Sequence, residues 1–184
     1  MAGPVVVAAV ALPEEPSGVL AEARDSKIMT PKSRERLFGV ISSQAVAVSV
    51  AWAYPQAIDE HNILKATLMA MGRAARRAAA KTGGDSFLVL VDGPRPIPAF
   101  ELPQETVIDG DAKSLSIAAA SIVAKVIRDR WMARLERKHP GYGFSKHKGY
   151  GTKAHLAALD RLGPCAVHRR SYAPVARRLQ ETPR

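Results

Sequence analysis

An aspartate at the start of a long apolar helix constrains this chain more than any other feature. In GDAKSLSIAAASIVAKVIRD, residues 110–129, Asp111 follows a glycine in a tight turn, and a helix-forming run of small apolar residues begins at once. Upstream, the apolar run FLVLVDG has the character of a buried strand that stops in a turn at Asp92. Two carboxylates at the ends of two buried elements are what a site for a divalent cation needs.

Each aspartate also has a simpler interpretation. Asp92 fits a turn aspartate that bonds its own backbone, and Asp111 fits a carboxylate that is favoured electrostatically at a helix N-terminus. Ligands nevertheless bind at strand ends in open α/β sheets. Two metal ions about 3.5–4 Å apart activate water and stabilise a leaving oxygen in phosphodiester cleavage. Capping and metal binding therefore both remain open from the residues alone.

Composition narrows the class of protein. A length of 184 residues fits about one domain, and the net charge of +10 indicates a polyanionic partner, most simply nucleic acid. An ordinary basic surface is the alternative. The single cysteine, Cys165, excludes an internal disulfide and fits a reducing cytoplasm. The apolar N-terminal run lacks a basic segment before it and is too short to span a bilayer, so no membrane association is expected.

Hydrophobic patterns predict a single α/β domain over residues 1–175, with a mixed sheet flanked by helices and a basic tail at 176–184. The proline-rich segment 94–103 is expected to be an extended loop. Thr30 and Pro31 are an N-cap and first-turn pair, and Leu64, Leu68, Met71 and Ala75 are expected to line one face of a helix, with arginines extending outward. Strands are predicted at 4–12, 46–54, 87–91 and 105–108, and helices at 30–43, 59–81, 114–138 and 152–162.

The segment HPGYGFSKHKGYG, residues 139–151, interleaves aromatic residues with cations. Aromatic rings stack on bases or sugars, and lysines pair with phosphates, so this pattern favours a nucleic-acid contact over an ordinary basic loop. The triplet Asp25-Ser26-Lys27 is a weak signal that also fits a solvated turn. Asp129 lies within a predicted helix beside arginines and is expected to pair with them or with a neighbouring helix rather than to bind metal.

Several long segments resemble bacterial ribonuclease HII, in the order in which that family has them. They span almost the whole chain from residue 2 to about residue 175, and the longer ones are highly specific. The matching segments are AGPVVVAAV, DSK, IDEHNILKATLMAM, VLVDG, GDAKSLSIAAASIVAKVIRD, PGYGFSKHKGYGTKAH and LGPCAVHRRSYAPV.

This resemblance implies a ribonuclease H-like α/β fold with a C-terminal helical region. It also implies cleavage of RNA in RNA/DNA hybrids and at single ribonucleotides in duplex DNA, leaving a 5′-phosphate and using Mg²⁺ or Mn²⁺. Asp92 and Asp111 match two metal-binding, catalytic carboxylates of the family. Tyr150 matches the tyrosine that packs on the sugar at the RNA–DNA junction, and Lys27 matches a phosphate-contacting lysine. The remaining nucleic-acid-binding candidates near these elements are Ser26 and Lys148.

The sequence departs from the family pattern in two places. The family has a strand ending in Asp-Glu-Ala-Gly-Arg-Gly, which supplies two further metal carboxylates and senses the 2′-hydroxyl, and this tract does not occur in the 184 residues. The resemblance therefore implies that the family's first, central strand is absent, through either a misassigned start codon or a truncated gene. Pro94 stands where the family usually has asparagine, which removes a backbone donor.

Three functions are compatible with these observations. The first is a metal-dependent ribonuclease that is impaired as given, because two carboxylates are missing. The second is a non-catalytic protein that binds RNA/DNA hybrids. The third, a basic structural or ribosome-associated protein, leaves the contexts of Asp92 and Asp111 unexplained. A cytoplasmic monomer is expected.

Overall fold

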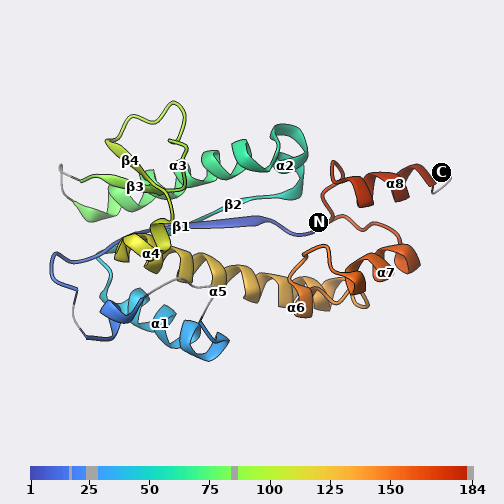
Figure 1. The fold of residues 1–184 in the computed structure, drawn as a ribbon, viewed down its shortest axis with the longest axis horizontal. Coiled ribbons are helices and arrows are strands. Elements are labelled where there is room, and N and C mark those ends of the chain that lie inside the picture. Colours follow the sequence, from blue (N-terminus) through green and yellow to red (C-terminus); the bar gives the residue numbers. More distant parts are fainter. Residues whose placement is uncertain (17, 24–28, 84–86, 182–184) are drawn as a thin grey trace. The chain divides into compact units, whose positions relative to one another are not determined.

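The computed structural model describes residues 1–16, 18–23, 29–83 and 87–181. Strands and helices alternate along these residues, which confirms the α/β class (Figure 1). The elements are β1 (Val5–Ala11), the 3-10 helix η1 (Gly18–Glu22), α1 (Pro31–Gln44), β2 (Ala47–Ala53), α2 (Pro55–His61), α3 (Ile63–Thr82), β3 (Val89–Asp92), β4 (Gln104–Val107), α4 (Gly110–Lys113), α5 (Leu115–Lys138), α6 (Phe144–His147), α7 (Lys153–Leu162) and α8 (Ala173–Glu181).

The chain divides into two compact units. The sheet unit comprises Val6–Trp52 and Thr67–Val126, and the helical unit comprises Met1–Val5, Ala53–Ala66 and Ile127–Arg184. The helices α3 and α5 contribute residues to both. Within the described ranges, no helix combines the length and the apolar character needed to cross a membrane.

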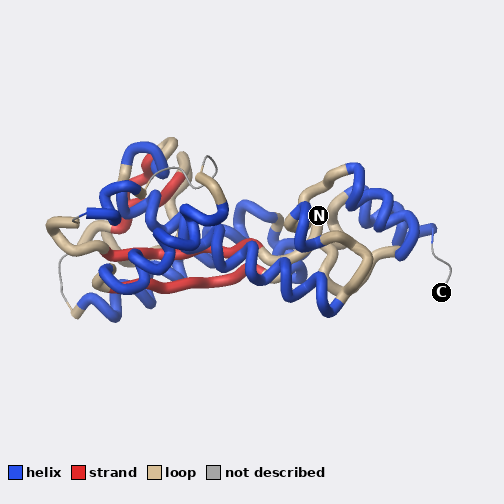
Figure 2. The backbone as a smooth tube through the Cα atoms, turned by 90° about the horizontal axis from the view of Figure 1, so that it is seen from below, coloured by secondary structure: helices blue, strands red, loops and turns tan. Residues whose placement is uncertain are grey.

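The described strands form two small sheets instead of the single mixed sheet expected from the sequence. One sheet pairs β1 with β2, and the other pairs β3 with β4 in parallel (Figure 2). In the second sheet Val89 lies opposite Gln104, and Asp92 lies opposite Val107. This register brings the ends of β3 and β4 to the same edge, where the segment leading to α4 begins.

Small residues form the buried faces of two elements. In β2 the buried positions are occupied by alanine and serine, and the larger side chains of the opposite face are half-buried. In α3 an alanine face is buried, which includes Ala75 as expected, whereas Leu64, predicted on the same face, is 46% exposed. Small side chains allow the backbones of neighbouring elements to approach closely. A prediction that looks only for large apolar residues does not detect such a buried face. The buried alanines of α3 are Ala66, Ala70, Ala74, Ala75 and Ala78.

A helix break at Asn62 corrects the single helix expected over 59–81. Asn62 has a φ of 64°, and its Oδ1 accepts a hydrogen bond from the amide of Lys65 at 3.0 Å. This positive φ turns the chain out of α2, and the Asn62 side chain caps the helix that follows. One residue therefore ends α2 and begins α3.

Helix ends agree closely with the sequence at two other places. Thr30 caps α1 by accepting a hydrogen bond from the amide of Ser33, and Thr152 caps α7 by accepting one from the amide of His155. The C-terminal end differs, because α8 continues to Glu181 and residues 176–181 of the expected tail are helical.

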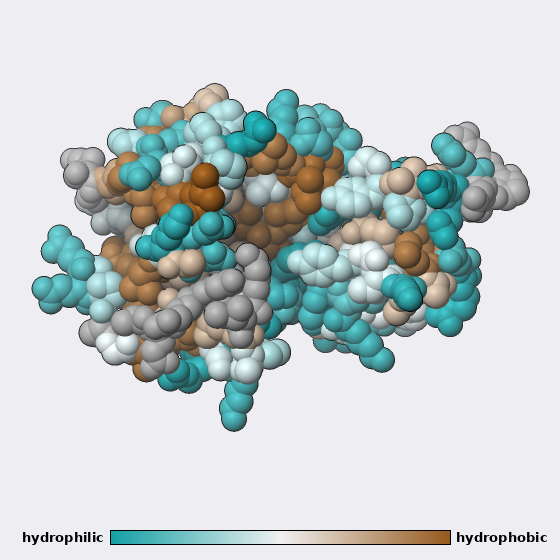
Figure 3. Space-filling view, in the orientation of Figure 1, coloured by the Kyte–Doolittle hydropathy of each residue, from teal (hydrophilic) through white to brown (hydrophobic). Residues whose placement is uncertain are grey.

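In the space-filling view, apolar residues reach the surface between hydrophilic ones (Figure 3).

Candidate active site and nucleic-acid contacts

Asp92 is the last residue of β3, and its carboxylate is held by a backbone amide. The amide of Gly110 donates to Asp92 Oδ1 at 3.1 Å, and the amide of Gly93 donates to the carbonyl of Val107 at 2.9 Å. Gly93 has a φ of 100°, a conformation that favours glycine, so the chain turns sharply after Asp92. The Asp92 side chain is exposed at this turn.

Asp111 lies in the first turn of α4, directly after Gly110, and is half-buried. The hydrogen bond from Gly110 to Asp92 therefore brings the strand end and the helix start together. Gly110 itself leaves no room for a side chain, since a Cβ there would lie 2.5 Å from Ile117 Cδ1 and 3.0 Å from Asp92 Oδ1. The absence of a side chain at Gly110 allows α4 to approach Asp92 this closely.

The carboxylates of Asp92 and Asp111 are suited chemically to a hard divalent cation. Carboxylate oxygens are the protein ligands that Mg²⁺ and Mn²⁺ prefer, and Mg²⁺ usually keeps several waters beside one or two carboxylates. Among the residues that the structure describes, however, no group of three or more His, Cys, Asp or Glu side chains is placed to hold a metal. Asp92 and Asp111 are thus of the chemical type that such a cation prefers, and the described residues show no closed metal cage around them.

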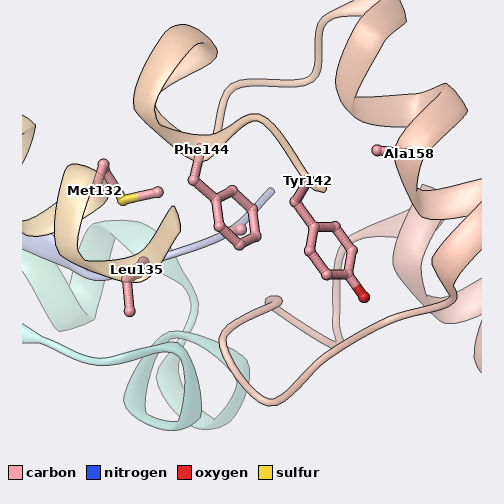
Figure 4. Close-up of a cluster of buried hydrophobic side chains, with 6 residues drawn as sticks. Met132, Leu135, Tyr142, Phe144 and Ala158 are labelled. Carbon is pink, nitrogen blue, oxygen red and sulfur yellow. The ribbon is translucent and has the colours of Figure 1, made fainter. Parts of the chain in front are cut away.

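Two aromatic residues of the 139–151 segment belong to the core and are unavailable to a ligand. Tyr142 is 7% exposed and Phe144 is fully buried, and their rings stack with centroids 5.1 Å apart and an interplanar angle of 3°. Figure 4 shows the two rings side by side, with Met132 and Leu135 near Phe144. The alternation of aromatic and basic residues therefore has partly a structural origin.

Tyr150, in contrast, is 62% exposed and presents its ring at the surface of the helical unit. The guanidinium of Arg128 lies over this ring, and Arg128 Nη1 also donates to the carbonyl of Lys148 at 2.8 Å. Lys148 has a left-handed φ of 51°, and its ammonium donates to the carbonyl of Ser145 at 2.6 Å. The exposed ring thus has Arg128 of α5 over it, and Lys148 precedes it by two residues in the loop.

The other two nucleic-acid candidates, Ser26 and Lys27, lie outside the described residues. Sequence reasoning missed Arg128, which is one of several arginines in α5 and carries no signal of its own contact with Tyr150. It also missed the buried histidines of the helical unit, whose spacing matches no metal motif.

Comparison with known proteins shows the family of this chain. The family described as Ribonuclease HII matches residues 1–175. Ribonuclease HII of Acidovorax sp. (strain JS42) is 51% identical over 181 residues, covering 98% of this chain and 83% of that protein.

Two solved structures share the fold. The ribonuclease H2 of Pyrococcus horikoshii OT3 superposes with a TM-score of 0.76 at 22% identity, covering 98% of this chain and 92% of that one. A structure described as Bst-RNase HIII in complex with Mn²⁺ gives a TM-score of 0.73 at 15% identity, covering 98% of this chain and 65% of that one. These likenesses confirm the expected ribonuclease H-like fold.

Proposed function

Because the chain belongs to the ribonuclease HII family, a family of ribonuclease H hydrolases, we propose that it cleaves the RNA strand of RNA/DNA hybrids and incises at single ribonucleotides embedded in duplex DNA. The products carry a 5′-phosphate. The observation that carries this proposal is the Asp92–Gly110 hydrogen bond, which sets Asp92 beside the helix turn that contains Asp111. We also propose that the protein is cytoplasmic and monomeric.

Asp92 and Asp111 are the residues that would hold Mg²⁺ or Mn²⁺. A bound cation supplies Lewis-acid polarisation of the phosphate and lowers the pKa of its water. The protein's own contribution is orientation. The Gly110 amide holds one oxygen of Asp92, so the carboxylate keeps one direction without a ligand. Such fixed geometry matters, because a misplacement of about 1 Å can cost roughly 10²-fold in rate.

Tyr150 supplies the contact that favours a ribonucleotide junction. Its exposed ring is suited to packing on a sugar, and Lys148 and Lys27 add positive charge for the phosphates, with Ser26 as a further hydrogen-bonding group. The net charge of +10 supports attraction to a polyanion. Affinity for hybrid should therefore fall steeply as salt concentration rises.

A second candidate function is hybrid binding without efficient cleavage. The observation that favours it is that, in the described part of the chain, no group of three or more His, Cys, Asp or Glu side chains is placed to hold a metal. Fewer carboxylates hold the cation and its water less firmly. We propose that the 184-residue chain cleaves weakly, and that joining it to a strand with the Asp-Glu-Ala-Gly-Arg-Gly tract raises the rate by more than about 10²-fold.

The test compares Asp92→Asn and Asp111→Asn with wild type. Cleavage and binding are measured on a duplex with one embedded ribonucleotide, a uniform hybrid and an all-DNA duplex, in Mg²⁺ and in Mn²⁺. Asp109→Asn is a matched control, because Asp109 is exposed, has a left-handed φ of 56° that asparagine also tolerates, and carries the same charge close to the site.

Both site variants should lose cleavage and keep binding, and the control should retain both. Wild-type cleavage rates in Asp92→Asn and Asp111→Asn would overturn the site. If the wild-type chain binds these duplexes specifically but does not cleave them, even after the strand with the Asp-Glu-Ala-Gly-Arg-Gly tract is joined to it, hybrid binding without cleavage is supported instead.

A further inference from the structure

A chain of buried hydrogen bonds lies beneath the loop that carries Tyr150. His155 and His168 are 0% and 1% exposed, and their Nε2 atoms are 3.1 Å apart. His155 Nδ1 lies 2.8 Å from the carbonyl oxygen of Tyr150. At the other end, the amide of Cys165 donates to His168 Nδ1 at 3.1 Å. These three links, from the Cys165 amide through His168 and His155 to the Tyr150 carbonyl, are called the histidine chain below.

The acceptors determine the proton positions along the histidine chain. The Tyr150 carbonyl only accepts, so His155 Nδ1 carries hydrogen and its Nε2 is the acceptor. His168 Nε2 must then donate to His155 Nε2, and His168 Nδ1 accepts from Cys165. Both imidazoles are neutral, and every ring nitrogen has a partner. One added proton would place two donors face to face.

Both the amide and the carbonyl of Tyr150 are held by hydrogen bonds. Its amide donates to the carbonyl of His147 at 2.9 Å, and its carbonyl accepts from the amide of Thr152 at 2.9 Å as well as from His155. Before it, Gly149 has a φ of 77°, and a Cβ there would lie 2.3 Å from the carbonyl oxygen of Ala2. An exposed ring therefore stands on a backbone that has little freedom to move.

We propose that His155 and His168 are positioning residues for Tyr150. The histidine chain fixes the Tyr150 carbonyl, and so the direction in which the ring leaves the loop toward the sugar of a ribonucleotide junction. The inference rests on the proposed function, in which Tyr150 makes that contact. A purely structural role would make the two histidines interchangeable with any residues that preserve the fold.

The protonation state at neutral pH agrees with this role. Burial lowers the pKa of His155 to about 4, against a smaller opposing effect of the hydrogen bond to Tyr150, and His147 lowers it further. Burial also lowers the pKa of His168 to about 4, with the neighbouring His155 next in importance. Both rings therefore stay neutral where the enzyme works.

Two amide substitutions at His155 separate positioning from packing. The amide nitrogen of asparagine takes the place of imidazole Nδ1, whereas glutamine reaches the place of Nε2. His155→Asn therefore keeps the donor to Tyr150 and loses the partner of His168. His155→Gln keeps the partner of His168 and loses the donor to Tyr150. Both variants are polar and uncharged, and both disturb the same buried site.

The readout is junction preference, the ratio of dissociation constants for a uniform hybrid and for a duplex with one embedded ribonucleotide, measured by fluorescence anisotropy without divalent cation. Tyr150→Ala defines the complete loss of this contact. Junction preference should fall roughly fivefold or more in that variant, as for the loss of an aromatic contact with a base. His155→Gln should approach that value, and His155→Asn should stay near wild type. Thermal unfolding of each variant reports on the fold.

A second pair applies if His155→Gln does not fold. His168→Gln keeps the donor to His155 Nε2, which holds the hydrogen of His155 on Nδ1, and should preserve junction preference. His168→Asn removes that donor, so His155 can take the other tautomer and lose its donor to Tyr150, and junction preference should fall. Equal preference in the asparagine and glutamine variants at a position would overturn the positioning role while leaving the proposed function intact. An unchanged preference in Tyr150→Ala would instead overturn the role of Tyr150 in the proposed function, and the inference with it.

Discussion

The guanidinium carbon of Arg128 lies 5.3 Å from the centre of the Tyr150 ring. The same side chain donates to the carbonyl of Lys148 through Nη1, so it supports both the ring and the loop. A planar guanidinium stacks on an aromatic face and hydrogen-bonds at its edge at once, which the ammonium of lysine does not reproduce.

Arg128→Lys should therefore weaken binding to a junction duplex even though the charge is kept. The expected loss is about 0.5–2 kcal/mol, the range of a cation–π contact. Titration of a labelled duplex at fixed salt measures it. Arg134→Lys, at an exposed position of the same helix α5, is the control and should bind as wild type. Equal losses in both variants would show that only general basicity matters.

Gly110→Ala should disturb the active site more than the fold. The added Cβ meets Ile117 and Asp92, so α4 must move away from β3. Overpacking of this kind costs about 1–3 kcal/mol of stability, and cleavage should fall by a factor comparable with Asp92→Asn. Rates and denaturant midpoints are measured together. Gly39→Ala in α1, where a Cβ meets nothing within 4 Å, should leave cleavage unchanged.

Asp59 should stabilise the helical unit through the turn before α8. Its carboxylate accepts from the amide of Arg170 at 2.8 Å, and from the amide and hydroxyl of Ser171 at 2.9 and 2.6 Å. Asp59→Asn should lower the free energy of unfolding by about 1.5–3 kcal/mol, the range for hydrogen bonds to a charged group. Glu60→Gln, at an exposed neighbouring position, should change it by less than about 0.5 kcal/mol.

Acid should destabilise this protein in two separate windows. Burial lowers the pKa of His155 and His168 from 6.5 to about 4, so the unfolded chain binds more protons between these values, and stability falls as the pH drops from about 6.5 to 4. For Asp59, burial acts to raise the pKa, but hydrogen bonds from Ser171 and Arg170 outweigh it and the pKa is lowered. That contribution is lost only below about pH 3.8, as the pH falls through the folded pKa.

Denaturant unfolding at a series of pH values from about 7 to 3 separates the two windows. Replacing both histidines, as His155→Asn with His168→Gln, should flatten the upper window and leave the lower one. A slope that persists in the double variant would assign the upper window to other groups. The groups that face the pair are Tyr142, Cys165, His139, His147 and the amino group of Met1.

Local signals in the sequence predicted the strand that ends at Asp92 and the long helix that follows Asp111, but not the short helix α4 that contains Asp111. Thr30 with Pro31 defined one helix start, and the apolar run before Asp92 defined a strand, because capping and strand burial depend on neighbouring residues. The break at Asn62 was missed, since an asparagine within an amphipathic pattern is compatible with a continuous helix. The burial of Tyr142 and Phe144 was also missed, because it depends on Met132 and other residues distant in sequence.

The histidine chain illustrates the same limit. Nothing in the spacing of His155 and His168 shows that their Nε2 atoms meet, because that contact depends on the path of the chain between α7 and α8. The position of Arg128 over Tyr150 likewise depends on how the loop returns to α5.

The hydrogen bond between Gly110 and Asp92 closes a separation of 18 residues, whereas Asp59 and the Ser171 amide are 112 residues apart. Short loops cost less entropy to close than long ones. During synthesis the chain is made from its N-terminus, so Asp92 and Asp111 are translated well before Ser171. The contact between Gly110 and Asp92 can therefore form early, while the hydrogen bonds of Asp59 with Ser171, and that of His168 beneath Tyr150, must wait for the last part of the chain.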